Sequence, residues 1–286
     1  MAELKPKTLA RALEILAGEE VTVVGGGTDL MVRHRTWAGL PARVLHPPLF
    51  TGGIAELRAL SVEDGRLQIG GAVTLSDLLL FPDTPDCFKQ ALRGMAAPGI
   101  RNIGTLAGNI CNASPAGDTL PVLYALGATV VLQSAQNVRK LPIETCITGP
   151  GRTVMQKGEL LTRVSVPLAP CDVMFYHKIG PRKAQAISKL TFVGLANVKN
   201  GVVTDVRAAF GAVGPTVVRR PEIERILVGK KAAELAARKE DVQAAYAPFI
   251  TPIDDQRSTA AYRKEAALGL LGRFIEQIAA KTGGAV

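Results

Sequence analysis

Two separate glycine-rich segments constrain the fold of this chain more than any other feature of its sequence. The longer one, R-N-I-G-T-L-A-G-N-I-C-N-A-S-P-A-G-D, spans residues 101–118 and leads into an apolar helix predicted over residues 120–126. Glycine has no Cβ, so the backbone N–H groups of such a segment can approach a ligand closely. Successive amides of this kind bind anions, and a helix N-terminus behind them suits a diphosphate. A structural turn rich in glycine and asparagine would have the same composition.

The second glycine segment lies earlier in the chain. A predicted buried strand, residues 21–24, ends at the sequence G-G-G-T-D of residues 25–29, and an apolar stretch follows. The spacing matches neither G-x-G-x-x-G nor G-x-x-x-x-G-K-[ST], so neither a Rossmann dinucleotide site nor a P-loop is predicted. Two such segments in one chain indicate a single extended ligand that is held from two sides. Thr28 and Asp29 are also typical helix caps, which is the purely structural interpretation.

Taken in order, V-V-G-G-G-T-D-L and R-N-I-G-T-L-A-G-N-I-C-N-A-S-P-A-G-D resemble the FAD-binding medium subunit of the xanthine dehydrogenase and carbon monoxide dehydrogenase family, the molybdenum hydroxylases. Residues 178–188 and 256–263 are similar to motifs in the C-terminal part of that family. The resemblance therefore covers nearly the whole chain. The family often has G-G-N where this chain has Ala107-Gly108-Asn109.

The resemblance implies an α+β fold. It predicts a two-lobed α/β FAD-binding domain of the vanillyl-alcohol-oxidase-like (PCMH) type over residues 1–170, with lobes of about residues 1–58 and 59–170. A smaller α/β C-terminal domain would occupy residues 171–286. In the family, FAD lies extended between the two lobes of the first domain.

The resemblance also implies which residues of this chain bind FAD. The residue spacing shows no Ser–His–Asp pattern and no metal-ligand spacing, so we expect no catalytic and no metal-binding residue. The backbone amides of residues 26–30 would face the diphosphate. Leu161 or Leu160 would pack on the flavin ring, and Lys178 would approach the ring from the C-terminal domain. Taken alone, Asp118 is equally a helix cap and Lys178 an ordinary surface lysine. The candidate FAD-binding residues are Gly25, Gly26, Gly27, Thr28, Asp29, Leu30, Thr105, Gly108, Asn109, Ser114, Asp118, Leu160, Leu161 and Lys178.

In the resembled family, a molybdenum subunit oxidises the substrate, and electrons pass through an iron–sulfur subunit to FAD and on to an acceptor such as NAD. The resemblance therefore implies an FAD-containing oxidoreductase subunit that acts within a complex. Its partners would be an iron–sulfur small subunit and a molybdenum large subunit that carries molybdopterin, in a higher oligomer of the heterotrimer. Two alternatives stay open: a stand-alone FAD-dependent oxidase or reductase, and a non-catalytic basic module that binds phosphate or nucleic acid.

Composition bears on these alternatives. The cysteines at positions 87, 111, 146 and 171 lie far apart without a C-x-x-C pair, so neither an iron–sulfur cluster nor a zinc site is expected here. The net charge is +9, but the basic residues are scattered and only 5% of residues are aromatic, which argues against nucleic-acid binding. No apolar run approaches the about 20 residues of a membrane span. The first residues, M-A-E-L-K-P-K-T, have no hydrophobic signal core, so we expect a cytoplasmic location.

Local patterns predict individual elements. Thr8, Thr74 and Ser258 are expected to cap helices. Asn200-Gly201, between two apolar runs, predicts a type I′ β-hairpin. Helices are predicted at residues 9–18, 75–80, 88–97, 120–126, 230–246 and 258–281, and a loop at the His-Pro-Pro sequence of residues 46–48.

Overall fold

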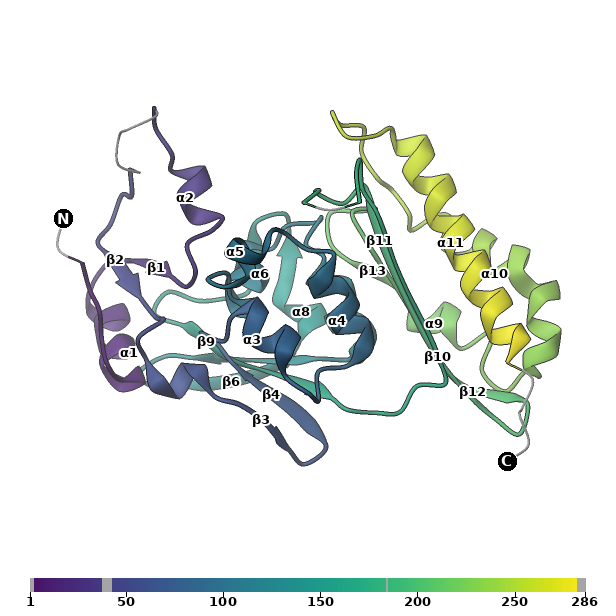
Figure 1. The fold of residues 1–286 in the computed structure, drawn as a ribbon, viewed down its shortest axis with the longest axis horizontal. Coiled ribbons are helices and arrows are strands. Elements are labelled where there is room, and N and C mark those ends of the chain that lie inside the picture. Colours follow the sequence, from purple (N-terminus) through teal and green to yellow (C-terminus); the bar gives the residue numbers. More distant parts are fainter. Residues whose placement is uncertain (1–2, 38–42, 184, 282–286) are drawn as a thin grey trace. The chain divides into compact units, whose positions relative to one another are not determined.

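The computed structural model of the chain describes residues 3–37, 43–183 and 185–281. The chain forms two compact units, whose elements are labelled in Figure 1. The first unit comprises Met1–Thr84, Ala96–Ser114 and Gly127–Leu168, and the second comprises Pro85–Met95, Pro115–Leu126 and Ala169–Val286. Two short segments from the N-terminal half of the chain therefore fold with its C-terminal part. The predicted domain ranges, 1–170 and 171–286, stay a prediction.

The described residues of the first unit form three sheets. A short parallel pair joins β1 and β2, with Thr22 opposite Pro48. The largest sheet is antiparallel, has the order β3-β4-β9-β5-β6, and has β9 as its central strand, while β7 and β8 form a small hairpin. The strands are β1 (Thr22–Val24), β2 (Pro48–Phe50), β3 (Leu60–Glu63), β4 (Arg66–Gly70), β5 (Thr129–Gln133), β6 (Val138–Pro142), β7 (Ile147–Gly149), β8 (Arg152–Thr153) and β9 (Leu160–Pro167).

Short helices connect these strands. The predicted caps of two of them are confirmed: the Thr8 hydroxyl accepts from the Arg11 amide at 3.3 Å, and Thr74 forms a reciprocal capping box with Asp77. Capping satisfies amide groups that a helix start leaves without a partner. The helices of the first unit are α1 (Leu9–Gly18), α2 (Leu30–Arg33), the 3₁₀ helix η1 (Ala55–Arg58), α3 (Leu75–Leu80), α5 (Pro98–Arg101), α6 (Leu106–Asn112) and α8 (Ile143–Cys146).

Two predictions for this unit are wrong in part. The loop predicted at residues 46–48 extends one residue too far, because β2 begins at Pro48. Proline is tolerated at the first residue of a strand, where its missing N–H breaks no ladder bond. The glycine-rich segment of residues 101–118, which its composition predicts to be a loop, contains the helix α6.

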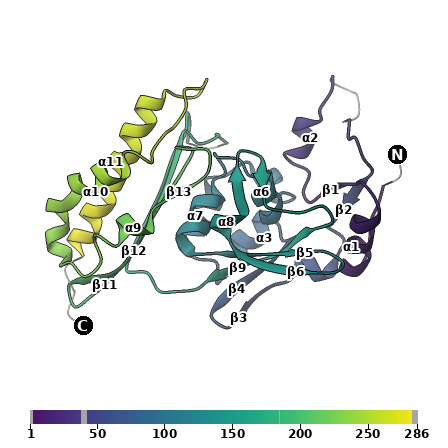
Figure 2. The ribbon, with the colours of Figure 1, turned by 180° about the vertical axis from the view of Figure 1, so that it is seen from behind.

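The second unit has one four-stranded antiparallel sheet of order β10-β11-β12-β13. The predicted hairpin is confirmed: Asn200 and Gly201 have φ angles of 52° and 73° and join β11 to β12. Helix α11 packs on β10 and β11, and α7 packs on β11 and β12 (Figure 2). The strands are β10 (Val173–Ile179), β11 (Leu190–Lys199), β12 (Val202–Gly211) and β13 (Val218–Arg219).

The two faces of this sheet are covered by helices from different parts of the chain. Phe192 and Phe210 lie on the face toward α11. There the ring centroids of Phe192 and Phe274 are 5.8 Å apart. On the opposite face, a Cβ built on Gly211 would lie 2.7 Å from Pro121 Cγ, so glycine allows α7 to approach β12 closely. The helices of the unit are α4 (Asp86–Arg93), α7 (Thr119–Leu126), α9 (Pro221–Glu224), the 3₁₀ helix η2 (Ala232–Arg238), α10 (Lys239–Tyr246) and α11 (Ala260–Ala280).

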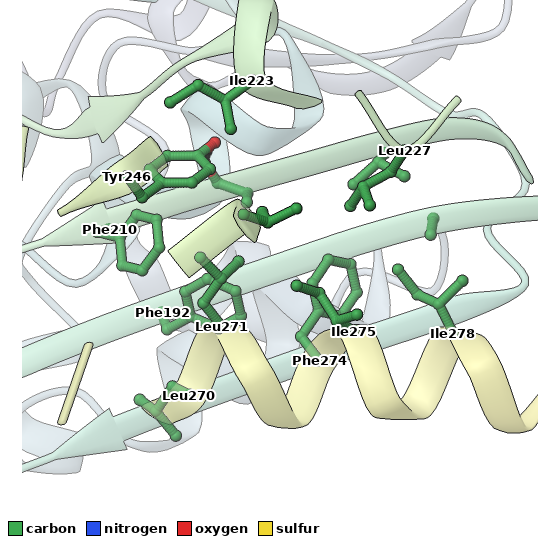
Figure 3. Close-up of a cluster of buried hydrophobic side chains, with 14 of the residues drawn as sticks. Phe192, Phe210, Ile223, Leu227, Tyr246, Leu270, Leu271, Phe274, Ile275 and Ile278 are labelled. Atoms are coloured by element: carbon green, nitrogen blue, oxygen red, sulfur yellow. Dashed lines mark hydrogen bonds between the residues drawn. The ribbon is translucent and has the colours of Figure 1, made fainter. Parts of the chain in front are cut away.

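Aromatic and aliphatic side chains fill the space between this sheet and α11 (Figure 3). Figure 3 shows Leu271, Ile275 and Ile278 of α11 directed toward the strands of the sheet. The helix predicted at residues 258–281 is confirmed as α11. Its cap is Thr259 and not Ser258, since the Thr259 hydroxyl accepts from the Tyr262 amide. The single helix predicted at 230–246 is a 3₁₀ helix followed by α10, and the helix predicted at 88–97 is α4, which begins at Asp86 and ends at Arg93. No helix in the described ranges is long and apolar enough to cross a membrane.

Two carboxylates hold the chain entering α11: Asp254 accepts from the Ala260 amide at 2.5 Å, and Asp255 makes a larger set of contacts. Its oxygens accept hydrogen bonds from Arg257 and from the buried Arg263, and also from the Ser258 amide. The Arg263 guanidinium, followed by that of Arg257, holds the pKa of Asp255 well below its usual range. The ionised carboxylate therefore stabilises the folded form.

We expect this carboxylate to make the second unit sensitive to acid. Because the pKa of Asp255 is lowered on folding, its contribution is present above the unfolded pKa of about 3.9 and is lost as the pH falls through the folded value. Asp255→Asn should lower stability at pH 7 and lose less stability than the wild type below about pH 4. Urea unfolding at pH 7 and pH 3 measures this, with Asp83→Asn, at an exposed position, as the control. Equal acid sensitivity of D255N and the wild type would contradict it.

Candidate functional site

The two glycine segments touch each other within the first unit. A Cβ built on Gly26 would lie 1.9 Å from the Ile103 carbonyl oxygen and 2.7 Å from Gly104 Cα. A Cβ on Gly25 would lie 2.9 Å from Thr105 Oγ1. Real side-chain carbons do not approach a backbone oxygen this closely, so only glycine at position 26 permits the contact. The structure thus brings together the two segments that the sequence singled out.

The first segment presents a row of unused hydrogen-bond donors. Within the described part of the chain, no group accepts a hydrogen bond from the five backbone amides of Gly25, Gly26, Gly27, Thr28 and Asp29. These residues are half-buried or exposed. Backbone amides without a protein partner are normally satisfied by solvent or by a ligand. A row of them is an arrangement that binds an anion such as a diphosphate.

The second segment has a different local structure. Thr105 caps α6: its hydroxyl accepts from the Gly108 amide at 3.0 Å, and its carbonyl oxygen accepts from the Asn109 amide at 3.1 Å. These two amides are therefore occupied within the protein. At the end of α6, Ala113 turns the chain with a φ angle of 47°. These two amides cannot bind a ligand at the same time. A ligand would instead contact the side chains of the segment and the exposed Gly108.

Asp118 and Lys178 form a buried ion pair within the second unit. Lys178 Nζ lies 2.7 Å from Asp118 Oδ2 and donates a second hydrogen bond, of 2.9 Å, to the Gly94 carbonyl. The hydroxyls of Ser188 and Thr191 donate to the other carboxylate oxygen, Asp118 Oδ1. Both charged side chains are about one-tenth exposed, 11% for Lys178 and 8% for Asp118. The network satisfies both charges, as burial requires.

The remaining candidates lie in the first unit. Leu160 and Leu161 open β9 and are 6% and 2% exposed, and Leu160 belongs to the core cluster around α1. Leu30 begins α2 and is half-buried, as are Asn109 and Ser114. That Leu160 or Leu161 packs on a flavin ring, and that the other candidates contact FAD, stays a prediction.

Three residues near the candidates were not predicted. Ser188 and Thr191 complete the Asp118 network, and no sequence pattern links them to a residue 70 and 73 positions away. Arg33 contacts both glycine segments, since it pairs with Asp29 and donates to Asn112. Its spacing of four residues from Asp29 is the usual one for a helical ion pair and is the signal that would have found it.

The fold and these segments define an FAD-binding domain followed by a flavoprotein C-terminal domain. Residues 2–169 match the family model of the FAD binding domain in molybdopterin dehydrogenase. Residues 175–278 match the CO dehydrogenase flavoprotein C-terminal domain. The chain belongs to the FAD-binding medium subunits of the xanthine dehydrogenase and carbon monoxide dehydrogenase family, as its sequence motifs predicted.

Two relatives match over almost their whole length. The chain is 29% identical over 283 residues to the glyceraldehyde dehydrogenase medium chain of Sulfolobus acidocaldarius, covering 96% of this chain and 97% of that protein. It is 27% identical over 286 residues to a xanthine dehydrogenase FAD-binding subunit of Escherichia coli, covering 97% and 95%. A chain in the crystal structure of the cyanide-inactivated Cu,Mo-CO dehydrogenase has the same fold, with a TM-score of 0.87 over 98% of both chains at 24% identity. The predicted α+β fold is confirmed, and the protein is an oxidoreductase subunit of the dehydrogenase type.

Proposed function

We propose that the diphosphate of FAD binds to the row of amides from Gly25 to Asp29. These amides have no acceptor in the described chain, and the segment is packed on the second glycine segment, so its shape is fixed before the cofactor arrives. A pre-shaped row of donors loses little entropy when it binds an anion. The family match to an FAD binding domain over the same residues supports this assignment.

The chain's own residues would hold and orient the cofactor. Thr105, Gly108, Asn109 and Ser114 would line the second side of the site, and Leu161 or Leu160 would contact the flavin ring. Asp118 and Lys178 stay predicted FAD contacts. Bound FAD supplies the electron-transfer chemistry, while the protein positions it and tunes its potential.

We propose further that the subunit relays electrons. An iron–sulfur small subunit would supply them from a molybdenum large subunit that carries molybdopterin, and FAD would pass them to an acceptor such as NAD. The two relatives are a dehydrogenase medium chain and an FAD-binding subunit, which supports a place in such a complex.

The proposal is tested on the purified full chain and on the complex isolated with it. The chain should bind FAD and take on a flavin absorption spectrum, and the complex should contain iron and molybdenum and reduce NAD when given its substrate. A colourless chain that binds no added FAD would contradict the cofactor assignment. A complex that reduces a quinone or ferredoxin but not NAD would contradict only the acceptor.

A further inference from the structure

The segment proposed to bind the diphosphate carries a negative charge of its own. Asp29 is the last of the five residues with unused amides, and its side chain is about half exposed, at 53%. The diphosphate of FAD carries two negative charges. A carboxylate close to it raises the free energy of the bound state unless another group offsets the charge.

Arg33 supplies that charge and at the same time connects the two glycine segments. Its Nε lies 2.7 Å from Asp29 Oδ2, one helical turn earlier in the chain. Its Nη2 donates to the side-chain oxygen of Asn112, the last residue of α6. A guanidinium has five donors in one plane, so it can bind both groups in a fixed geometry, which an ammonium does less well.

We propose that Arg33 is a positioning residue for FAD, a role that rests on the proposed function of the glycine segments. Its guanidinium neutralises Asp29 and holds the end of α6 at a fixed distance from the first segment. Arg33 acts through Asp29 and Asn112.

The exposure of the ion pair separates this role from a structural one. Arg33 and Asp29 are both more than half exposed, at 55% and 53%. Exposed pairs contribute little to folding stability. Loss of Arg33 should therefore leave the unfolding temperature of the FAD-free chain nearly unchanged. It should weaken FAD binding, because the uncompensated Asp29 then faces two further negative charges.

The test measures FAD binding to the full chain by flavin fluorescence at low ionic strength, together with thermal unfolding of the FAD-free chain. Arg33→Met should raise the dissociation constant for FAD about two- to fivefold, the order expected for one exposed charge interaction. Added salt should reduce this difference. Arg33→Met combined with Asp29→Asn should recover most of the lost affinity, and Arg33→Lys should recover part of it.

Arg11→Met is the matched control. Arg11 forms an exposed ion pair with Glu14 on α1 in the same unit, at 3.0 Å, away from both glycine segments. This variant should bind FAD as the wild type does. The role of Arg33 is contradicted if R33M binds FAD like the wild type, or if adding D29N recovers nothing. If the wild-type chain itself binds no FAD, both this inference and the proposed cofactor assignment fall.

Discussion

Replacing Gly26 with alanine is expected to destabilise the first unit by about 2–4 kcal/mol and to abolish FAD binding at micromolar cofactor. The added methyl would lie 1.9 Å from the Ile103 carbonyl oxygen. Backbone borders the contact on both sides, so no side chain can rotate away to make room. The two glycine segments must separate, and the row of amides loses its shape.

Denaturant unfolding and an FAD titration measure the two parts of this effect. Gly53→Ala is the control, because an added Cβ at this exposed position meets no atom within 4 Å. Gly25→Ala should have an intermediate effect, since its Cβ meets the hydroxyl of Thr105, a side chain that can shift. A G26A variant as stable as G53A, with unchanged FAD affinity, would show that the close approach of the two segments is unimportant.

Replacing Asp118 with alanine is expected to destabilise the second unit by about 3–5 kcal/mol. The substitution leaves the Lys178 ammonium buried beside the Ser188 and Thr191 hydroxyls, which have then lost their shared acceptor. Removing one partner of a buried ion pair is costly because the remaining charge is neither solvated nor paired.

Calorimetry or urea unfolding of D118A measures this loss. Asp205→Ala is the control, since Asp205 pairs with Arg207 at 2.8 Å in the same unit but is 38% exposed. Combining Asp118→Leu with Lys178→Met removes both charges and should restore much of the stability. If D118A is no less stable than D205A, the buried pair does not hold this unit together.

The parts of the fold that the sequence predicted are those determined by local interactions. Thr8 and Thr74 cap helices through residues three positions ahead, and Asn200-Gly201 forms its turn from its own backbone preferences. Where two adjacent residues were equally suitable, as with Ser258 and Thr259, the pattern could not choose between them. Here Ser258 turns back to Asp255, which leaves Thr259 as the cap.

The candidate site was predictable to the same extent. Glycines 25–27 and the segment around Thr105 were identified from composition and order, and the structure brings them into contact. The partners of Asp118 were not predictable, because Lys178, Ser188 and Thr191 reach it through the pairing of β10 with β11, which lie far along the chain. Helix α6 was missed because glycine and asparagine disfavour helices, and the Thr105 cap offsets that preference.

Helices α4 and α7 belong to the second unit although they lie in the N-terminal half of the chain, and this limits how the polypeptide can be divided into fragments. Both helices precede Leu168, yet they cover one face of a sheet made entirely of residues after Ala169. A C-terminal fragment that begins at this junction would leave one face of the sheet β10-β11-β12-β13 uncovered. The matching N-terminal fragment would contain α4 and α7 without the sheet on which they pack. A chimaera of two relatives should therefore take residues 85–95 and 115–126 from the same relative as its C-terminal part.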